Sequence, residues 1–269
     1  MMKLAGREDI AVRAAVRDPQ SVAMAADNVT PVKFVYEDRA SMRAACAGVD
    51  AVFWVTPVAE NQVELAAAFV EEAKAAKVPY IVKLSAVGMD AAKPMSVARW
   101  HLEMEAGLKA AGIPFTSLRP SGFMQNFLGN SAPLPDGNMY APMSDAKVAY
   151  IDVRDIADVA VRCLTETGHA GKTYYLYGPE AITMSQVAAT LSEVTGRQIR
   201  YVDVPQEAAK RAMAGANMPG WLVDMVAEIQ THAREGHSAK VNSTVRELAR
   251  HSGTTFRDFA RDHAKAWKS

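Results

Sequence analysis

The sequence predicts an α/β protein built on a doubly wound parallel sheet. Short apolar segments, rich in β-branched and aromatic residues, alternate with longer segments in which apolar residues recur at helical spacing. Strands that are joined by helices in this way pair in parallel through right-handed crossovers. The strand segments are largely apolar, as expected where helices cover both faces of a sheet. We therefore expect such a sheet, with a smaller and mostly helical lobe formed by the C-terminal part of the chain.

Turn-forming residues mark the ends of several elements in the first half. Gly48 and Gly112 each follow a helical segment in the position of a C-terminal cap. A strand segment ends at Thr56-Pro57, and another is broken by Arg119-Pro120, because proline cannot continue a hydrogen-bonded ladder. In this half we expect strands at 9–16, 31–36, 50–55, 78–84 and 113–118, and helices at 41–47, 61–76 and 99–111.

The second half contains an irregular stretch and then more helix. Residues 131–144 are rich in Pro, Gly, Asn and Asp, which predicts a loop. Thr183 is a suitable N-cap for a helix that Gly196 ends, and the chain from residue 206 onward is mostly helical in pattern. Here we expect a helical turn at 122–128, strands at 148–153, 173–177 and 199–204, and helices at 155–166 and 184–195.

The composition limits the class of protein. Lys plus Arg and Asp plus Glu both number 30, so the formal net charge is zero and a basic surface for nucleic acid or anionic membranes is not expected. There is no signal-peptide pattern and no run of about 18 apolar residues, so we expect a soluble, cytoplasmic protein. Cys46 and Cys163 lie in apolar, helix-like segments, which favours buried thiols over a disulfide or a zinc site.

Candidate ligand-binding residues follow the strands, because ligands of open α/β sheets bind at the carboxyl ends of strands. Arg17 follows the strand at 9–16, where an arginine can pair with a ribose 2′-phosphate and favour NADP over NAD. An equally good interpretation is a solvated turn arginine. Thr56-Pro57 could face the ribose and phosphate of a cofactor, although the simpler interpretation is a strand terminator.

Two further strand ends carry polar residues. Lys83 lies inside an apolar run, so it needs a carboxylate or a ligand as partner. Ser85 could orient a substrate carbonyl or the nicotinamide ribose, or it could simply cap the strand with a hydrogen bond. After the next strand, Ser121 and Asn126 could line a cofactor pocket and Phe123 could pack on the nicotinamide or on a flat substrate. As isolated residues, they could equally belong to the core.

One histidine is a candidate for proton transfer. His101 and Glu105 are four residues apart on a predicted helix, hence on one face, and histidine can donate a proton near neutral pH. The alternative is a surface pair that stabilises the helix by a few tenths of a kcal/mol. No further ligand has suitable spacing, so we expect no metal site. We assign no role to the other histidines considered, which are His232, His237, His251 and His263.

Several segments, taken in order, resemble one family. They are AVRDP at 15–19, AGVDAVFWVTP at 47–57, VKLSAVG at 82–88, RWHLEMEAGLKAAGIPFTSLRPSGFMQN at 99–126, YIDVRDIADVA at 150–160, GKTYYLYGPEAITMSQVA at 171–188 and TFRDFARDHA at 255–264. The family is the NmrA-like branch of the atypical short-chain dehydrogenases/reductases, which includes NAD(P)H:quinone reductases. The Tyr-x-x-x-Lys motif of typical short-chain dehydrogenases is not found.

The resemblance implies a Rossmann-like fold that binds NADPH, or alternatively NADH, and transfers a hydride to a small conjugated acceptor such as a quinone. It places an NAD(P)-binding domain at 1–150, to which later segments also contribute, and the remaining strands with a substrate lobe at 151–269. Arg17 matches the 2′-phosphate arginine, Thr56-Pro57 the loop against the cofactor, and 121–126 the segment beside the nicotinamide. His101 stands where related isoflavone-reductase-like enzymes carry a lysine acid/base.

The start of the sequence departs from the family, which opens with a strand and G-A-T-G-x-x-G. No such motif is found here, so we expect a sheet that is incomplete at its N-terminal side. Three explanations compete. The start codon could lie upstream, the chain could be a short dinucleotide-sensing regulator or protein-binding module, or the fold could be unrelated. A short form would leave strand edges exposed, and a homodimer is one way to cover them.

Overall fold

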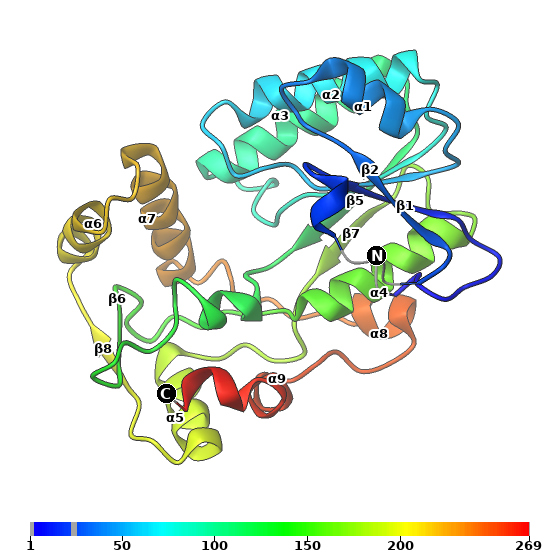
Figure 1. Cartoon of the computed structure of the whole chain (residues 1–269). Coiled ribbons are helices and arrows are strands. Elements are labelled where there is room, and N and C mark those ends of the chain that lie inside the picture. Colours follow the sequence, from blue (N-terminus) through cyan, green and yellow to red (C-terminus); the bar gives the residue numbers. More distant parts are fainter. Residues whose placement is uncertain (1–2, 23–25, 269) are drawn as a thin grey trace. The chain divides into compact units, whose positions relative to one another are not determined.

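The computed structural model describes residues 3–22 and 26–268 and divides into two compact units. The first comprises the described residues of Met1–Ser85, with Trp100–Leu118 and Ala157–Thr173. The second comprises Ala86–Arg99, Arg119–Ile156 and the described residues of Tyr174–Ser269. The predicted functional division at residue 150 stays a prediction. Figure 1 shows the path of the chain through both units.

Parallel strands follow one another in the order that the sequence predicts. A two-stranded sheet joins β1 (Val12–Val16) and β2 (Val29–Lys33) in parallel. A four-stranded sheet has the order β3-β4-β5-β7, and its β3–β4 and β4–β5 pairs are parallel. Its strands are β3 (Val52–Trp54), β4 (Ile81–Leu84), β5 (Phe115–Pro120) and β7 (Thr173–Leu176). The predicted parallel α/β architecture is confirmed.

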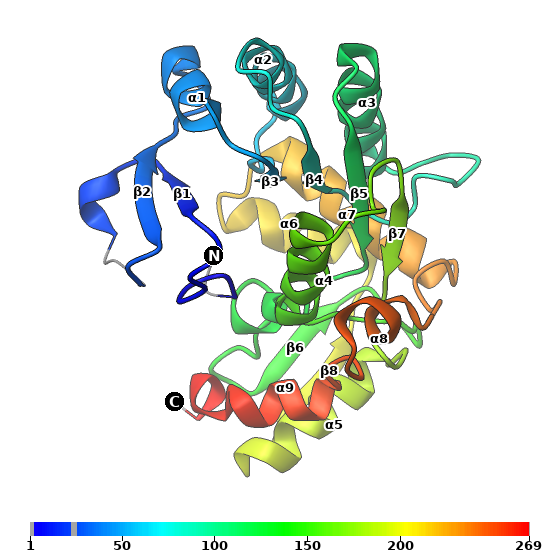
Figure 2. The same cartoon turned by 90° about the vertical axis from the view of Figure 1, so that its right-hand side faces the viewer.

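Three helices lie side by side along the strands in the first unit (Figure 2). They are α1 (Arg39–Cys46), α2 (Gln62–Ala75) and α3 (Ser96–Ala111), whose first residues belong to the second unit. Their apolar faces form a buried core with the strands, to which Met42, Trp54, Phe69, Ile81 and Leu108 contribute. Burying each of these side chains stabilises the fold by about 1.5–3 kcal/mol. This core fixes the face of α3 that meets β4 and β5.

Both cysteines are buried, as predicted, and neither forms a disulfide. Cys46 ends α1, and Cys163 lies in α4 (Val153–Thr165). Burial raises the pKa of the Cys46 thiol to about 11 and that of Cys163 to about 12. Because a thiol with so high a pKa carries almost no thiolate at neutral pH, the two side chains behave as small apolar groups.

The second unit contains most of the remaining helices and a second parallel strand pair. The helix α5 (Met184–Thr195) has the predicted cap, because Thr183 and Gln186 form a reciprocal capping box and Gly196 ends the helix with φ +72°. The predicted helical C-terminal part is also found. Its helices are α6 (Gln206–Gly215), α7 (Gly220–Arg234), α8 (Thr244–Ala249) and α9 (Phe256–Asp262). Among residues 3–22 and 26–268, no helix combines the length and apolar character needed to cross a membrane.

Two predicted elements are wrong. The stretch 131–144 is not all loop, because it contains β6 (Asn138–Ala141), which pairs in parallel with β8 (Arg200–Asp203). The segment 148–153 is not a regular strand. It makes only isolated bridges, from Val148 to Ile182 and from Ile151 to Phe123. In both places the structure depends on pairing with residues that are distant in sequence, so local composition alone predicts the wrong element.

The sequence predicted that Arg119 and Pro120 break the strand at 113–118, and this prediction is wrong. Instead they are its last residues, because β5 runs from Phe115 to Pro120. Proline is tolerated at a strand end, where its missing N–H is not needed. The Pro120 carbonyl still accepts a hydrogen bond from the Val87 amide at 3.2 Å. The strand therefore ends two residues later than expected.

Candidate active site

A fully buried lysine lies near the carboxyl end of the central strand β4. Lys83 is 0% exposed, although it belongs to the apolar run that forms this strand. Its Nζ atom donates a hydrogen bond to the Leu84 carbonyl at 3.0 Å and lies 3.0 Å from Nδ1 of His101. The same Nζ lies 4.7 Å from the centroid of the Trp54 ring. The partners of this buried amine are thus a carbonyl, an imidazole and an aromatic face.

This environment changes the charge of the lysine. Burial lowers the pKa of Lys83 to about 7, because a buried ammonium loses its hydration, and the nearby Glu105 carboxylate only partly opposes that effect. Near neutral pH, a substantial fraction of Lys83 therefore carries no charge. An amine with such a pKa can accept and return a proton under physiological conditions, which an exposed lysine does not do.

Glu105 connects the helix α3 to the end of β4 and to the interior of β5. The residue is 9% exposed, and its carboxylate accepts hydrogen bonds from the Ser85 hydroxyl at 2.7 Å and from the Ser117 hydroxyl. Ser85 directly follows β4, and Ser117 lies in β5. This hydrogen bond from Ser85 is the structural contact at the strand end that we gave as the alternative to a ligand-binding role. The cofactor-binding role of Ser85 stays a prediction.

His101 and Glu105 share one face of α3, as their spacing predicts. That face meets the sheet, because His101 contacts Lys83 of β4 and Glu105 contacts serines that β4 and β5 position. The alternative of an exposed surface pair is therefore wrong for Glu105. The sequence predicted Lys83 and Ser85 as one strand-end pair and His101 as a separate candidate, and the structure brings these three residues together in the first unit.

The other candidates in the first unit follow β1 and β3. Arg17 comes directly after β1 and is exposed, and its guanidinium has no hydrogen-bond or ion-pair partner among the residues that the structure describes. Thr56 and Pro57 follow β3 and are half-buried. Beside them the chain exposes apolar side chains, since Val55 is 48% and Val58 is 72% exposed. A guanidinium without a protein partner is free to bind an anion such as a phosphate.

The remaining candidates lie together in one turn of the second unit. Ser121 is buried, and its amide donates a hydrogen bond to the Leu176 carbonyl at 2.9 Å. Phe123 is half-buried and precedes the short 3₁₀-helix η2 (Met124–Leu128), in which Asn126 is exposed. The Asn126 amide donates to the Phe123 carbonyl at 3.2 Å. Local chain geometry thus groups Ser121, Phe123 and Asn126.

Two members of the Lys83 cluster were not recognised as candidates from the sequence. Trp54 covers the Lys83 amine, stacks on Phe69 with ring centroids 4.6 Å apart, and donates a hydrogen bond to the Tyr36 hydroxyl at 2.9 Å. Ser117 fixes Glu105 by donating to its carboxylate from β5. No motif marks either residue. The available signal was positional, because both lie on strands that flank β4.

Comparison with known proteins identifies the family. The NmrA-like family matches residues 1–260. The chain belongs to this family. Over 228 residues it is 38% identical to an NAD(P)H azoreductase of Xenophilus azovorans, covering 84% of this chain and 80% of the relative. Over 260 residues it is 36% identical to a (4-alkanoyl-5-oxo-2,5-dihydrofuran-3-yl)methyl phosphate reductase of Streptomyces griseus, covering 95% and 90%.

A solved structure supports the same assignment. An NADPH-dependent quinone oxidoreductase from Escherichia coli, complexed with NADPH, superposes with a TM-score of 0.85 at 30% sequence identity. The match covers 97% of this chain and 92% of that one. The resemblance drawn from the sequence segments and the Rossmann-like fold are therefore confirmed. The third explanation, an unrelated fold, is wrong.

Proposed function

We propose that this NmrA-like protein is an NADPH-dependent oxidoreductase that transfers a hydride to a small conjugated acceptor such as a quinone. The relatives named above are all reductases or oxidoreductases, and their names describe an azoreductase, a quinone oxidoreductase and a reductase of an oxo-dihydrofuran phosphate. One observation in this chain carries the proposal. The buried amine of Lys83, with a pKa of about 7, contacts His101 near the carboxyl end of β4, where ligands of such sheets bind.

Residues at several strand ends fit the cofactor. Arg17 has the charge, the exposure and the lack of a described partner that a 2′-phosphate site needs. Thr56 and Pro57 follow β3 in the same unit. In the second unit, Ser121 to Asn126 form the turn that the family resemblance assigns to the nicotinamide. We infer that Arg17, Thr56 and Pro57 of the first unit contribute to holding NADPH, which supplies the hydride when it is bound.

The protein's own contribution is proton transfer. A conjugated acceptor that gains a hydride must also gain a proton, and a positioned side chain with a pKa near 7 does this best. We infer that His101 donates that proton and that Lys83 Nζ returns one to Nδ1 of His101 across their 3.0 Å contact. Glu105, held by Ser85 and Ser117, keeps α3 and therefore the His101 ring at this distance.

Calorimetry and steady-state kinetics test the proposal on the full chain. NADPH should bind, and its absorbance should fall with time when a benzoquinone is added. Arg17→Ala should weaken NADPH binding by about tenfold or more and leave NADH binding nearly unchanged, because only NADPH carries the 2′-phosphate. Arg211→Ala is the matched control, since Arg211 is an exposed arginine of α6.

The possible outcomes separate the two candidate functions. NADPH binding with no oxidation by quinone or azo acceptors would favour a dinucleotide-sensing regulator over a reductase. If neither dinucleotide binds, both functions fail for this chain. An Arg17→Ala variant that loses NADH and NADPH binding equally would show that Arg17 does not read the 2′-phosphate.

A further inference from the structure

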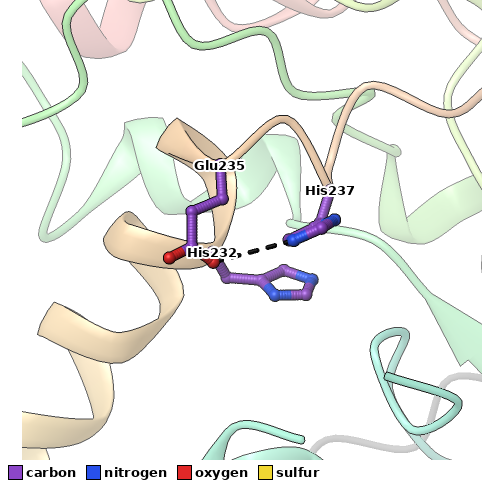
Figure 3. A group of neighbouring side chains, drawn as sticks. All are labelled: His232, Glu235 and His237. Atoms are coloured by element: carbon purple, nitrogen blue, oxygen red, sulfur yellow. Dashed lines mark ion pairs between the residues drawn. The ribbon is translucent and has the colours of Figure 1, made fainter. Parts of the chain in front are cut away.

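A second group of titratable side chains lies in the second unit and has no part in the function proposed above. His232 is near the end of α7, Glu235 is the C-cap of that helix, and His237 follows two residues later. Figure 3 shows the two imidazole rings and the carboxylate gathered around the helix end. In the ring pair, the centroids of His232 and His237 are 4.7 Å apart and the planes are tilted by 37°.

The way α7 ends brings these side chains together. Gly236 has φ +85°, its amide donates to the Ala233 carbonyl at 2.9 Å, and the His237 amide donates to the His232 carbonyl at 3.3 Å. This hydrogen-bond pattern is the Schellman motif, in which the residues at the positions of His232 and His237 usually share an apolar contact. Here both positions carry imidazoles, so the motif holds two nitrogen ligands side by side.

The distances suit shared binding of one cation. The ligand atoms of His232, Glu235 and His237 all lie within 4.8 Å of one another, and Nε2 of His237 is 3.6 Å from a carboxylate oxygen of Glu235. Ligands of a tetrahedral Zn²⁺ ion, each about 2.1 Å from the metal, are about 3.4 Å apart. The Glu235 and His237 side chains are 60% and 57% exposed, so small rotations about their side-chain bonds can close the difference.

The residue types select the class of metal. Two imidazoles with one carboxylate are one of the ligand sets of three-ligand zinc sites, whose fourth position holds water or another ligand. Mg²⁺ and Ca²⁺ prefer oxygen ligands throughout, so this set disfavours them.

Space for a fourth ligand lies beside the rings. His232 and His237 line a cavity of about 300 Å³, together with Gly88, Asp90 and Tyr175 among others. Gly88 has φ +85°, and a Cβ atom there would lie 3.0 Å from Cε of Met95 and 3.5 Å from Nε2 of His232. The backbone at Gly88 therefore comes close to the imidazole without filling the cavity.

We propose that His232, Glu235 and His237 bind a divalent transition-metal ion, preferentially Zn²⁺, with the fourth coordination position facing this cavity. The ion would join the end of α7 to the segment after it. The site uses none of the residues assigned to NADPH or to proton transfer, so it stands or falls independently of the reductase proposal.

Metal titration of the untagged, metal-free full chain tests this site. Calorimetry with Zn²⁺ should show one specific site, and Co²⁺ should give the visible absorption of a four-coordinate nitrogen and oxygen complex. His237→Ala and His232→Ala should each lower Zn²⁺ affinity by at least about tenfold, because each removes a ligand. Glu235→Gln should weaken binding less, since an amide oxygen still coordinates. Mg²⁺ should not compete.

His263→Ala is the matched control, because His263 is a half-buried histidine of the same unit that packs on Phe259. It should bind Zn²⁺ as the wild type does. His237 is exposed, so its substitution leaves the fold intact even if His232→Ala disturbs α7. Unchanged affinity in both His232→Ala and His237→Ala would overturn the proposal and leave the cluster as a helix cap with two imidazole rings in contact. Equal loss in His263→Ala would mean that binding is non-specific.

Discussion

Two clusters in this molecule use the same residue types in opposite surroundings. In the first unit, His101 and Glu105 of α3 contact Lys83, Ser85 and Ser117, and Lys83 and Glu105 are buried. In the second, the carboxylate and one imidazole of the group formed by His232, Glu235 and His237 are exposed. A histidine and a glutamate on one helix therefore do not specify a role by themselves.

Solvent access separates the two clusters chemically. Burial lowers the pKa of Lys83 to about 7, so the first cluster can hold or release a proton near neutral pH. The second cluster has two exposed side chains, Glu235 and His237, and its imidazoles line a cavity of about 300 Å³, which suits binding of a cation. The comparison predicts that pH acts mainly on the first cluster and that added metal acts mainly on the second.

The largest expected effect concerns the pH dependence of stability. An unfolded lysine has a pKa of about 10.4, whereas burial lowers that of Lys83 to about 7. The unfolded chain therefore binds more protons between these values, so this group's contribution to the free energy of unfolding rises with pH across that window. Lys83→Met removes the titration, so the stability of this variant relative to wild type should fall by about 3 kcal/mol between about pH 7 and about pH 9.5.

Urea unfolding of both proteins at the two pH values measures this difference. Other titrating groups are common to both proteins and cancel in the comparison. Lys109→Met, at an exposed position of α3, should show no such trend and controls for the loss of a lysine as such. A stability difference that stays constant with pH would mean that Lys83 remains charged when buried.

The next effect tests the catalytic half of the comparison. His101→Asn should lower kcat for quinone reduction by about 100-fold, because it removes the proposed proton donor, while the Kd for NADPH stays unchanged. His251→Asn, at an exposed histidine outside both sets of proposed contacts, should leave kcat unaltered. Full activity in His101→Asn would show that another group, or water, donates the proton.

The smallest effect concerns the geometry of the second cluster. Gly236 has φ +85°, and a Cβ atom at this position would meet nothing within 4 Å, so Gly236→Ala causes backbone strain but no collision. It should lower the free energy of unfolding by about 1 kcal/mol and weaken Zn²⁺ binding by displacing His237. Gly107→Ala in α3 also meets no collision and should stabilise the protein by up to about 1 kcal/mol instead. Equal Zn²⁺ affinity in wild type and Gly236→Ala would show that metal binding does not depend on the backbone conformation at the end of α7.

The sequence predicted the parts of the fold that depend on local pattern. The parallel order of the strands follows from alternating apolar segments, and the cap of α5 follows from Thr183 and Gly196. β6 could not be found in this way, because its four residues are a strand only through pairing with β8, about 60 residues later. The apolar run at 148–153 predicted a strand, but among the residues that the structure describes no neighbouring strand pairs with it along its length. It forms only single bridges there, so the prediction was wrong.

The candidate site was predictable to a similar extent. Lys83 stood out because a lysine in an apolar strand needs a partner, and His101 stood out by its helix face. The burial of Glu105 was not predictable, because helix spacing does not say which face meets the sheet. His232 and His237 are five residues apart and share no helix face. Only the left-handed Gly236 brings them together, so the signal that could have found them is the Glu-Gly pair at a helix end.

The indole ring beneath Lys83 gives the buried amine an optical signal. Because Nζ lies 4.7 Å from the Trp54 centroid, gain or loss of its proton changes the electric field on that ring, and the fluorescence of Trp54 changes with it. The difference between the emission of wild type and of Trp54→Phe isolates this signal from the other tryptophans. The protein thus carries an intrinsic, label-free reporter of the protonation state at the centre of its first unit.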